Sequence, residues 1–298
     1  MGNKYKNIIS VTPPPPVHMV GDGFRVHNFF PSDPGVGIDG MSPFFLLDYG
    51  SKHHFPPSDK PRGVGVHPHR GFETVTIAYH GSISHYDSAG NSGVIHDGDV
   101  QWMTAAEGVL HKEYHEEEFT RKGGLFQMVQ LWVNLPARFK MIPPRYQAIT
   151  KDEIIQYFLG DHVSSIGIIA GEYKAMTGPA STFTPISLFN VKLIRGRSTD
   201  FTFPASYNTG ILVVEGEIKI NNIKNAPENH FVRLGHDSEY FYIEAVSDSI
   251  FLVMGGEPIN EPIASHGPFL MNTEEEIKQA YEDYKAGKFG QIEELVKH

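Results

Sequence analysis

The segment VTIAYHGSISHYD, residues 75–87, contains a short apolar run, a glycine and a second run in which apolar and polar residues alternate. A segment of similar build, GILVVEGEIKINN, occupies residues 210–222. Alternation of this kind on both sides of a glycine predicts two strands joined by a turn. The central glycines, Gly81 and Gly216, are 135 residues apart, whereas solenoid repeats run about 20–50 residues. We therefore expect a duplicated β domain.

The rest of the chain supports a mostly β protein. Further strand-like runs occupy residues 100–105, 126–135, 186–196 and 249–256, and helical periodicity is nearly absent before the last thirty residues. Many short strands separated by Gly, Pro, Asn and Asp predict a sandwich or barrel. Prolines and charges interrupt the strand pattern at residues 136–153, which predicts the join between two domains.

The C-terminal segment, residues 271–298, contains the strongest predicted helix. Asn272 or Thr273 can cap its first turn, three glutamates lie near its positive end, and Gly287 is a stop signal. Four residues repeat at helical spacing and predict a face packed on a β domain: Ile277, Ala280, Tyr281 and Tyr284.

Composition narrows the possible chemistry. The chain has no cysteine, so a metal would need nitrogen and oxygen ligands. The 25 Lys and Arg against 35 Asp and Glu give a net charge of −10, which disfavours direct binding to nucleic acid. Without a signal-peptide pattern or an apolar stretch of 18 residues, we expect a soluble, cytoplasmic protein, or a nuclear one if the source is eukaryotic.

The motif HPH, residues 67–69, is the first candidate metal site. Residues two apart in a strand point to the same face about 6.6–6.8 Å apart, so His67 and His69 can lean onto one ion. Pro68 points to the opposite face and donates no backbone hydrogen bond, which predicts an edge strand, a strand start or a bulge. This motif alone is equally compatible with ordinary packing.

A second pair, His111 and Glu113, has the same spacing in GVLHKEYHEEEF. Together the two pairs predict an N3O site that leaves two of six octahedral positions open for substrate. Neighbouring residues compete for these roles. Glu73 and His115 are in phase with the pairs, His85 and His96 lie between them, and residues 116–118 read as a solvated charge run.

Four longer stretches resemble the pirins, a branch of the cupin superfamily: HPHRGFETVT (residues 67–76), GDVQWMTAAEGVLHKE (98–113), QLWVNLP (130–136) and GPFLMNTEEEIKQA (267–280). The resemblance spans residues 28–291. It implies an all-β fold of two facing cupin (double-stranded β-helix, or jelly-roll) barrels with a C-terminal α-helix. We expect an N-terminal metal-binding domain at residues 1–134, a C-terminal cupin domain at 135–256 and an extension with the helix at 257–298.

The resemblance also assigns roles to particular residues. It implies that His67, His69, His111 and Glu113 bind a metal, usually iron, in the first domain. Other cupins take their acid from the place of Glu73, so Glu73 stays an alternative ligand or a neighbour of the ligands.

Two further expectations concern the pocket and the second domain. Gln130, in an otherwise apolar run, either faces the substrate pocket or is a satisfied core amide. In the second domain Thr202 and Pro204 stand at the 135-residue offset from His67 and His69, so this domain is expected to hold no metal.

Three functions are compatible with such a site. The first is a metal-dependent dioxygenase that cleaves quercetin or a related enol or phenol, with Glu113 accepting the substrate's hydroxyl proton. The second is an iron-dependent redox sensor that regulates a protein partner, and the third is a zinc-dependent isomerase or hydrolase. Fe(II) is the expected ion, and Mn(II), Ni(II), Cu(II) and Zn(II) are alternatives.

Overall fold

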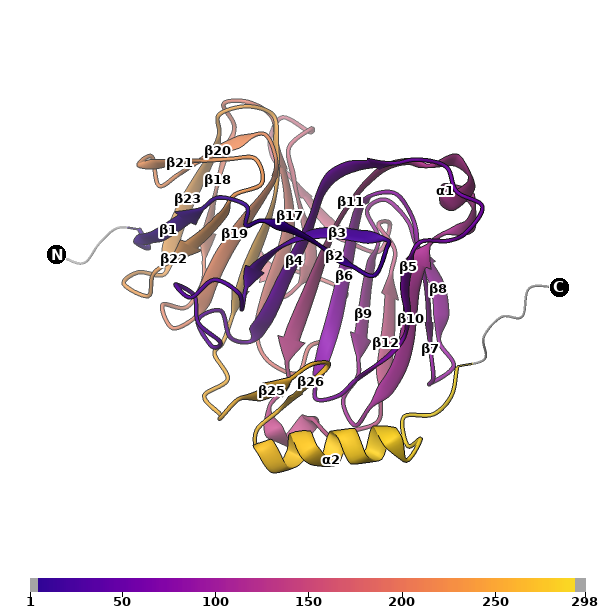
Figure 1. Cartoon of the computed structure of the whole chain (residues 1–298). Coiled ribbons are helices and arrows are strands. Elements are labelled where there is room, and N and C mark those ends of the chain that lie inside the picture. Colours follow the sequence, from indigo (N-terminus) through magenta and orange to yellow (C-terminus); the bar gives the residue numbers. More distant parts are fainter. Residues whose placement is uncertain (1–4, 293–298) are drawn as a thin grey trace. The chain divides into compact units, whose positions relative to one another are not determined.

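The computed structural model describes residues 5–292, and these residues form mostly β structure (Figure 1). The chain divides into two compact units that each draw on separate stretches of sequence. Unit 1 comprises Met1–Pro15, Asp33–Pro43 and Asp152–Pro258, and unit 2 comprises Pro16–Ser32, Phe44–Lys151 and Ile259–His298. The domain boundaries expected at residues 134 and 256 stay a prediction.

Unit 2 contains a seven-stranded and a four-stranded antiparallel sheet. The larger sheet has the order β12 (Arg145–Ile149), β9 (Val100–Thr104), β6 (Phe72–His80), β11 (Gly124–Asn134), β4 (Phe44–Phe55), β3 (Phe24–Phe30) and β2 (Val17–Val20). The smaller sheet has the order β5 (Gly63–His69), β10 (Val109–His115), β7 (Ile83–Asp87) and β8 (Ser92–Ile95). β5 is therefore an edge strand, which is one of the three placements that the proline between its two histidines predicted.

Unit 1 has the same two kinds of sheet. The larger has the order β1 (Ile8–Thr12), β22 (Phe231–Leu234), β19 (Asn208–Glu215), β24 (Ser249–Gly256), β17 (Ile186–Leu193), β14 (Ser165–Ala170) and β13 (Ile155–Phe158). The smaller has the order β18 (Ser198–Thr202), β23 (Tyr240–Ala245), β20 (Glu217–Ile220) and β21 (Lys224–Pro227). Each unit also has one short two-stranded pair: β15 (Glu172–Tyr173) with β16 (Met176–Thr177) in unit 1, and β25 (Ala264–His266) with β26 (Phe269–Met271) in unit 2.

The repeated strand–glycine–strand segments occupy equivalent places in the two units. β6 and β19 are each third in a seven-stranded sheet, while β7 and β20 are each third in a four-stranded sheet. Gly81 and Gly216, which join these strands, have φ angles of 89° and 76°, a left-handed conformation that glycine adopts at little cost. The sheet orders agree with the expected duplication, and the all-β fold class is confirmed.

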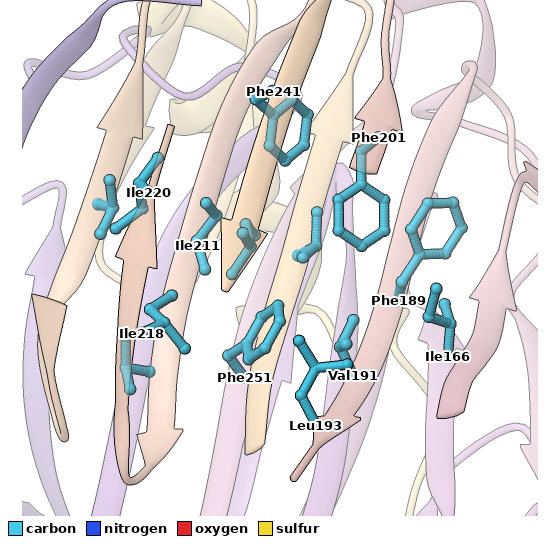
Figure 2. Packing of buried hydrophobic residues seen from close by; sticks show 14 of the residues in the cluster. Ile166, Phe189, Val191, Leu193, Phe201, Ile211, Ile218, Ile220, Phe241 and Phe251 are labelled. Atoms are coloured by element: carbon cyan, nitrogen blue, oxygen red, sulfur yellow. The ribbon is translucent and has the colours of Figure 1, made fainter. Parts of the chain in front are cut away.

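Apolar side chains from both sheets fill the interior of unit 1 (Figure 2). Phe201 stacks on Phe241 with ring centroids 5.2 Å apart, and Phe189 lies beside Phe201. These rings are fully buried. Each buried aromatic side chain contributes about 1.5–3 kcal/mol relative to its exposed state, so this unit is stabilised by a continuous apolar core.

The predicted C-terminal helix is confirmed as α2 (Glu274–Lys285). Thr273 is its N-cap and forms a capping box with Glu276. The helix packs against the β25–β26 pair through Ile277 and Ala280, but Tyr284 is exposed. Of the four residues expected on the packed face, Tyr284 thus lies at its margin.

The chain also contains two short helical segments, α1 (Glu117–Lys122) and the 3-10 turn η1 (Ala137–Phe139). The acidic run at residues 116–118, read from sequence as solvated charge, begins α1, and the Glu116 carboxylate accepts a hydrogen bond from the Phe119 amide. No helix among residues 5–292 is long and apolar enough to cross a membrane.

Candidate metal centre

His67 and His69 lie side by side near the end of β5. Their ring centroids are 4.8 Å apart, which agrees with the same-face placement expected for residues two apart in a strand. Pro68 between them is opposite Leu110 of β10. The motif therefore brings two imidazoles together at the edge of the smaller sheet of unit 2.

His111 of β10 completes a cluster of three imidazoles. It is the register partner of His67, and its ring centroid is 4.1 Å from that of His67 and 4.7 Å from that of His69. One ring nitrogen from each of the three lies within 4.8 Å of the others. The two sequence motifs, more than 40 residues apart, thus meet through antiparallel pairing of β5 and β10.

Backbone carbonyls orient two of these rings. His67 Nδ1 is 2.8 Å from the Gly65 carbonyl oxygen, and His69 Nδ1 is 3.3 Å from that of Pro268. Because a carbonyl oxygen only accepts, each Nδ1 carries a proton, and in the neutral form of each ring Nε2 keeps its lone pair. A hydrogen bond that fixes the tautomer in this way is typical of metal-binding histidines.

His111 has no such partner. It is 1% exposed, and within the described part of the chain neither of its ring nitrogens has a hydrogen-bond partner. Burial, and after it the charges of His67 and His69, holds its pKa well below the ordinary value. Burial likewise lowers the pKa of His69. Neutral imidazoles with free lone pairs fit a divalent metal ion, which would satisfy atoms that are otherwise costly to bury.

Glu113 belongs to a second, overlapping group. Its carboxylate and ring nitrogens of His85 and His111 lie within 4.8 Å of one another. Opposite β5 the register shifts between His111 and Glu113, so that Glu113 pairs with Val64. His111 is therefore common to a cluster of three histidines and a cluster that contains the carboxylate.

His85, which the sequence left only as a competitor, is part of that second group. It is fully buried, its Nε2 is 3.5 Å from Asp87 Oδ2, and its ring stacks on Tyr146 at 5.3 Å. Burial alone would raise the pKa of Asp87, but hydrogen bonds from His85 and Asn91 outweigh it and hold the pKa below its ordinary value. The His-x-Asp spacing on a strand was the available signal, because residues two apart share a face.

The other competitors lie elsewhere in the same unit. Glu73 of β6 is 1% exposed and accepts a 2.7 Å hydrogen bond from Thr104 Oγ1. Burial raises its pKa to about 7. His115 packs among phenylalanine rings and its Nε2 donates to the Gly23 carbonyl oxygen, while exposed His96 contacts Ser82. Within the described residues, none of these three belongs to either cluster.

The C-terminal segment contacts the chain at the end of β5, the histidine strand that carries His67 and His69. The Arg70 carbonyl accepts from the Leu270 amide, and the Arg70 guanidinium forms a buried 2.8 Å ion pair with Asp283 of α2. The Lys140 ammonium donates to the carbonyls of Gly71 and Leu270 at 2.7 and 2.8 Å. These contacts fix the backbone next to His69 and the Pro268 carbonyl that orients it.

His67 and His69 line a cavity of about 320 Å³ within unit 2, a volume near the lower end of small-molecule sites. His67, His69 and Glu113 lie in its wall, opposite side chains of the larger sheet. Most of the remaining lining is apolar, and the full set is Val20, Phe24, Val26, Asp48, Val64, Met128, Gln130, Trp132, Gly267 and Pro268.

Comparison with known proteins identifies the family. Residues 23–133 match the pirin family profile, and residues 188–290 match that of the pirin C-terminal cupin domain. The chain belongs to the pirin family. Its two units therefore have the cupin-type pirin fold that the sequence motifs implied.

Named relatives extend this likeness over nearly the whole chain. A Pseudomonas aeruginosa protein named "Putative quercetin 2,3-dioxygenase PA2418" is 45% identical over 272 residues, covering 91% of this pirin and 94% of the relative. A crystal structure of quercetin 2,3-dioxygenase from Acinetobacter baumannii is also 45% identical and superposes with a TM-score of 0.92 over 97% of this chain and 100% of that one.

A more distant structure has the same fold. The bacterial pirin YhhW from Escherichia coli, solved in complex with nickel(II), has a TM-score of 0.66 and is 20% identical over 84% of this pirin and 99% of YhhW. At that identity the comparison concerns the fold alone.

Proposed function

We propose that this pirin is a metal-dependent dioxygenase that acts on quercetin or a related enol-bearing phenol. His67, His69, His111 and Glu113 hold the divalent ion in this proposal. The names of the two relatives at 45% identity support the reaction class.

The observation that carries the proposal is the state of His111. Its two ring nitrogens are buried without hydrogen-bond partners next to two histidines whose tautomers are fixed by carbonyls. Each unpaired buried polar atom costs about 1–3 kcal/mol. A metal ion bound by the lone pair of one of these nitrogens removes the cost at that atom, and the adjoining cavity gives a small molecule access to the ion.

The residues around the ion have two roles toward the substrate: one accepts a proton and the others bind the aromatic ring. Glu113, in the cavity wall, accepts the proton of the hydroxyl that approaches the ion. Trp132, Phe24 and Met128 offer apolar surface to an aromatic ring and exclude water. When bound, the ion supplies Lewis acidity that lowers the pKa of a coordinated hydroxyl and, if redox-active, mediates electron transfer to dioxygen.

The donor set suits several ions. We propose Fe(II), because three imidazoles and one carboxylate fit a divalent ion and dioxygen chemistry favours one that can change oxidation state. Mn(II), Ni(II) and Cu(II) fit the same donors. Zn(II) also fits them but would restrict the site to redox-neutral chemistry. We place the protein in the cytoplasm, with a small aromatic molecule and dioxygen as its substrates.

Oxygen uptake tests the proposed reaction. Purified protein is stripped of metal, reloaded anaerobically with Fe(II) or Mn(II), and mixed with quercetin and dioxygen in an oxygen-electrode cell. We expect metal-dependent uptake that His111→Ala abolishes and His96→Ala, a matched change at an exposed histidine of the same unit, leaves intact. Stoichiometric metal without uptake would contradict the dioxygenase and favour the redox-sensing alternative.

Metal content tests the choice of carboxylate. Glu113→Gln should lower the occupancy of the site after dialysis by at least tenfold, because a neutral amide replaces the charged ligand. Glu73→Gln should retain one ion per chain, since Glu73 belongs to neither cluster of described residues. The reverse pattern would assign the ligand role to Glu73.

A further inference from the structure

Asp48 and Gln130 form a polar pair in the otherwise apolar side of the cavity. They are register partners on the adjacent strands β4 and β11, and directly opposed residues of an antiparallel pair point to the same face with Cβ atoms about 4.5–5.5 Å apart. Both line the cavity that also contains His67, His69 and Glu113. The pair thus lies on the larger sheet, whereas these three residues come from the smaller one.

The alternation of β11 shows that this position faces the cavity. Met128, Gln130 and Trp132, each two residues apart, all line it, as expected for one face of a strand. The Gln130 amide therefore lies between two apolar side chains on that face and gives this part of the cavity wall a polar group that can bind a ligand.

Existing hydrogen bonds determine what each side chain can offer a ligand. Thr76 Oγ1 donates to Gln130 Oε1 at 2.8 Å, so the Nε2 amide group of Gln130 keeps its donors for the cavity. Asn28 Nδ2 donates to Asp48 Oδ1 at 2.7 Å, which leaves Oδ2 of Asp48 as an acceptor. The pair therefore presents one acceptor and one donor group side by side.

A hydroxyl group satisfies both functions at once. Its hydrogen can be donated to Asp48 Oδ2 while its oxygen accepts from Gln130 Nε2. Burial, partly opposed by the Asn28 hydrogen bond, raises the pKa of Asp48, which indicates that this carboxylate has lost hydration that a donor from a ligand would replace. Apolar lining from Phe24, Val26 and Trp132 suits the aromatic ring that carries such a hydroxyl.

We infer that Asp48 and Gln130 select aromatic substrates that carry a second hydroxyl, distant from the group that approaches the histidines. This inference rests on the proposed function and makes its substrate class narrower: a polyhydroxylated flavonol or similar phenol rather than an unsubstituted one. Asp48 and Gln130 are specificity-determining residues that do not take part in the chemical step.

Anaerobic binding measurements test this selection separately from turnover. Metal-loaded protein is titrated with quercetin and with 3-hydroxyflavone, which keeps the flavonol core and lacks the other ring hydroxyls. We expect wild type to bind quercetin about tenfold or more tightly, the ratio typical of a hydrogen bond to a charged group. Asp48→Asn, which can still accept from Asn28, should reduce this ratio at least fivefold without changing the affinity for 3-hydroxyflavone.

Two further variants sharpen the result. Gln130→Leu should lower the same ratio, whereas Asp59→Asn, which removes a charge from an exposed carboxylate of the same unit, should not. Equal affinity of wild type for the two flavonols, or an Asp48→Asn variant that keeps the wild-type ratio, would overturn the inference and leave the dioxygenase intact. Failure of wild type to bind either flavonol would overturn both, and selective binding without oxygen uptake would overturn the dioxygenase alone.

Discussion

Replacing Asp283 by alanine should loosen helix α2 from the end of the histidine strand. Asp283 Oδ2 is 2.8 Å from Arg70 Nη1, and the two side chains are 10% and 5% exposed. Arg70 also donates to the Glu107 carbonyl and lies over the Phe289 ring. These contacts would remain in the variant, but none of them carries a compensating negative charge.

The size of the effect follows from the charge that is left behind. Breaking a buried ion pair by removing one partner costs about 3–5 kcal/mol, because the other charge stays buried without compensation. Arg70→Met should cost less, since the carboxylate of Asp283 keeps its hydrogen bonds from Lys288 and Gln279, at 2.7 and 3.0 Å. The double variant should then lose less than the two single losses combined.

Hydrogen exchange followed by mass spectrometry measures this effect locally. A loss of about 3–5 kcal/mol in opening free energy corresponds to amide exchange about 100-fold or more faster in peptides from α2 and β5. Glu118→Ala, which breaks the exposed 2.6 Å pair with Lys122, serves as the matched control and should leave exchange outside α1 unchanged. Acceleration below threefold at Asp283→Ala would refute the claim that this ion pair fastens the helix.

Three further changes have defined outcomes. Burial raises the pKa of Glu73 from 4.5 to about 7. The contribution of Glu73 to stability is therefore full below pH 4.5 and is lost as the pH rises through 7. Glu73→Gln should flatten the change in the urea midpoint of the apo-protein between pH 5 and 8. Thr273→Ala removes the cap of α2 and should cost about 1 kcal/mol, seen as faster exchange of its first turn with other peptides unchanged. Lys140→Met leaves the buried carbonyls of Gly71 and Leu270 without their side-chain donor. The free energy of unfolding should fall by about 1–3 kcal/mol for each carbonyl left unpaired. A calorimetric melting temperature within 1 °C of wild type would contradict that cost.

The fold class could be predicted because its signals are local. Alternation specifies a strand, and a glycine such as Gly81 or Gly216 specifies the turn that follows it. Strand partners are not local. β1 pairs with β22, and β12 pairs with β9, through contacts between segments whose sequences carry no sign of each other. The pairing that places these strands depends on tertiary packing, which composition and periodicity do not report.

The candidate site divides in the same way. Two pairs of candidate ligands each lie within one strand: His67 with His69, and His111 with Glu113. The two-residue period of a strand was therefore enough to predict that each pair shares a face. The positions of His85 and Asp48 depend instead on the registers of β7 with β10 and of β4 with β11. The register shift beside Glu113 adds a local irregularity that spacing alone did not predict.

The two units place different chemistry at equivalent strands. In unit 1 the pair β18–β23 sets Phe201 opposite Phe241, and their stacked rings belong to an apolar core (Figure 2). In unit 2 the corresponding pair β5–β10 sets His67 opposite His111. Corresponding strand pairs can thus carry aromatic side chains, whose packing stabilises the fold without any ligand. Buried imidazole nitrogens without partners do the reverse and cost free energy until a ligand satisfies them. A local departure from good packing in one of two corresponding strand pairs marks a place where the chain gives up stability for binding, which is the physical reason to look for the metal in unit 2.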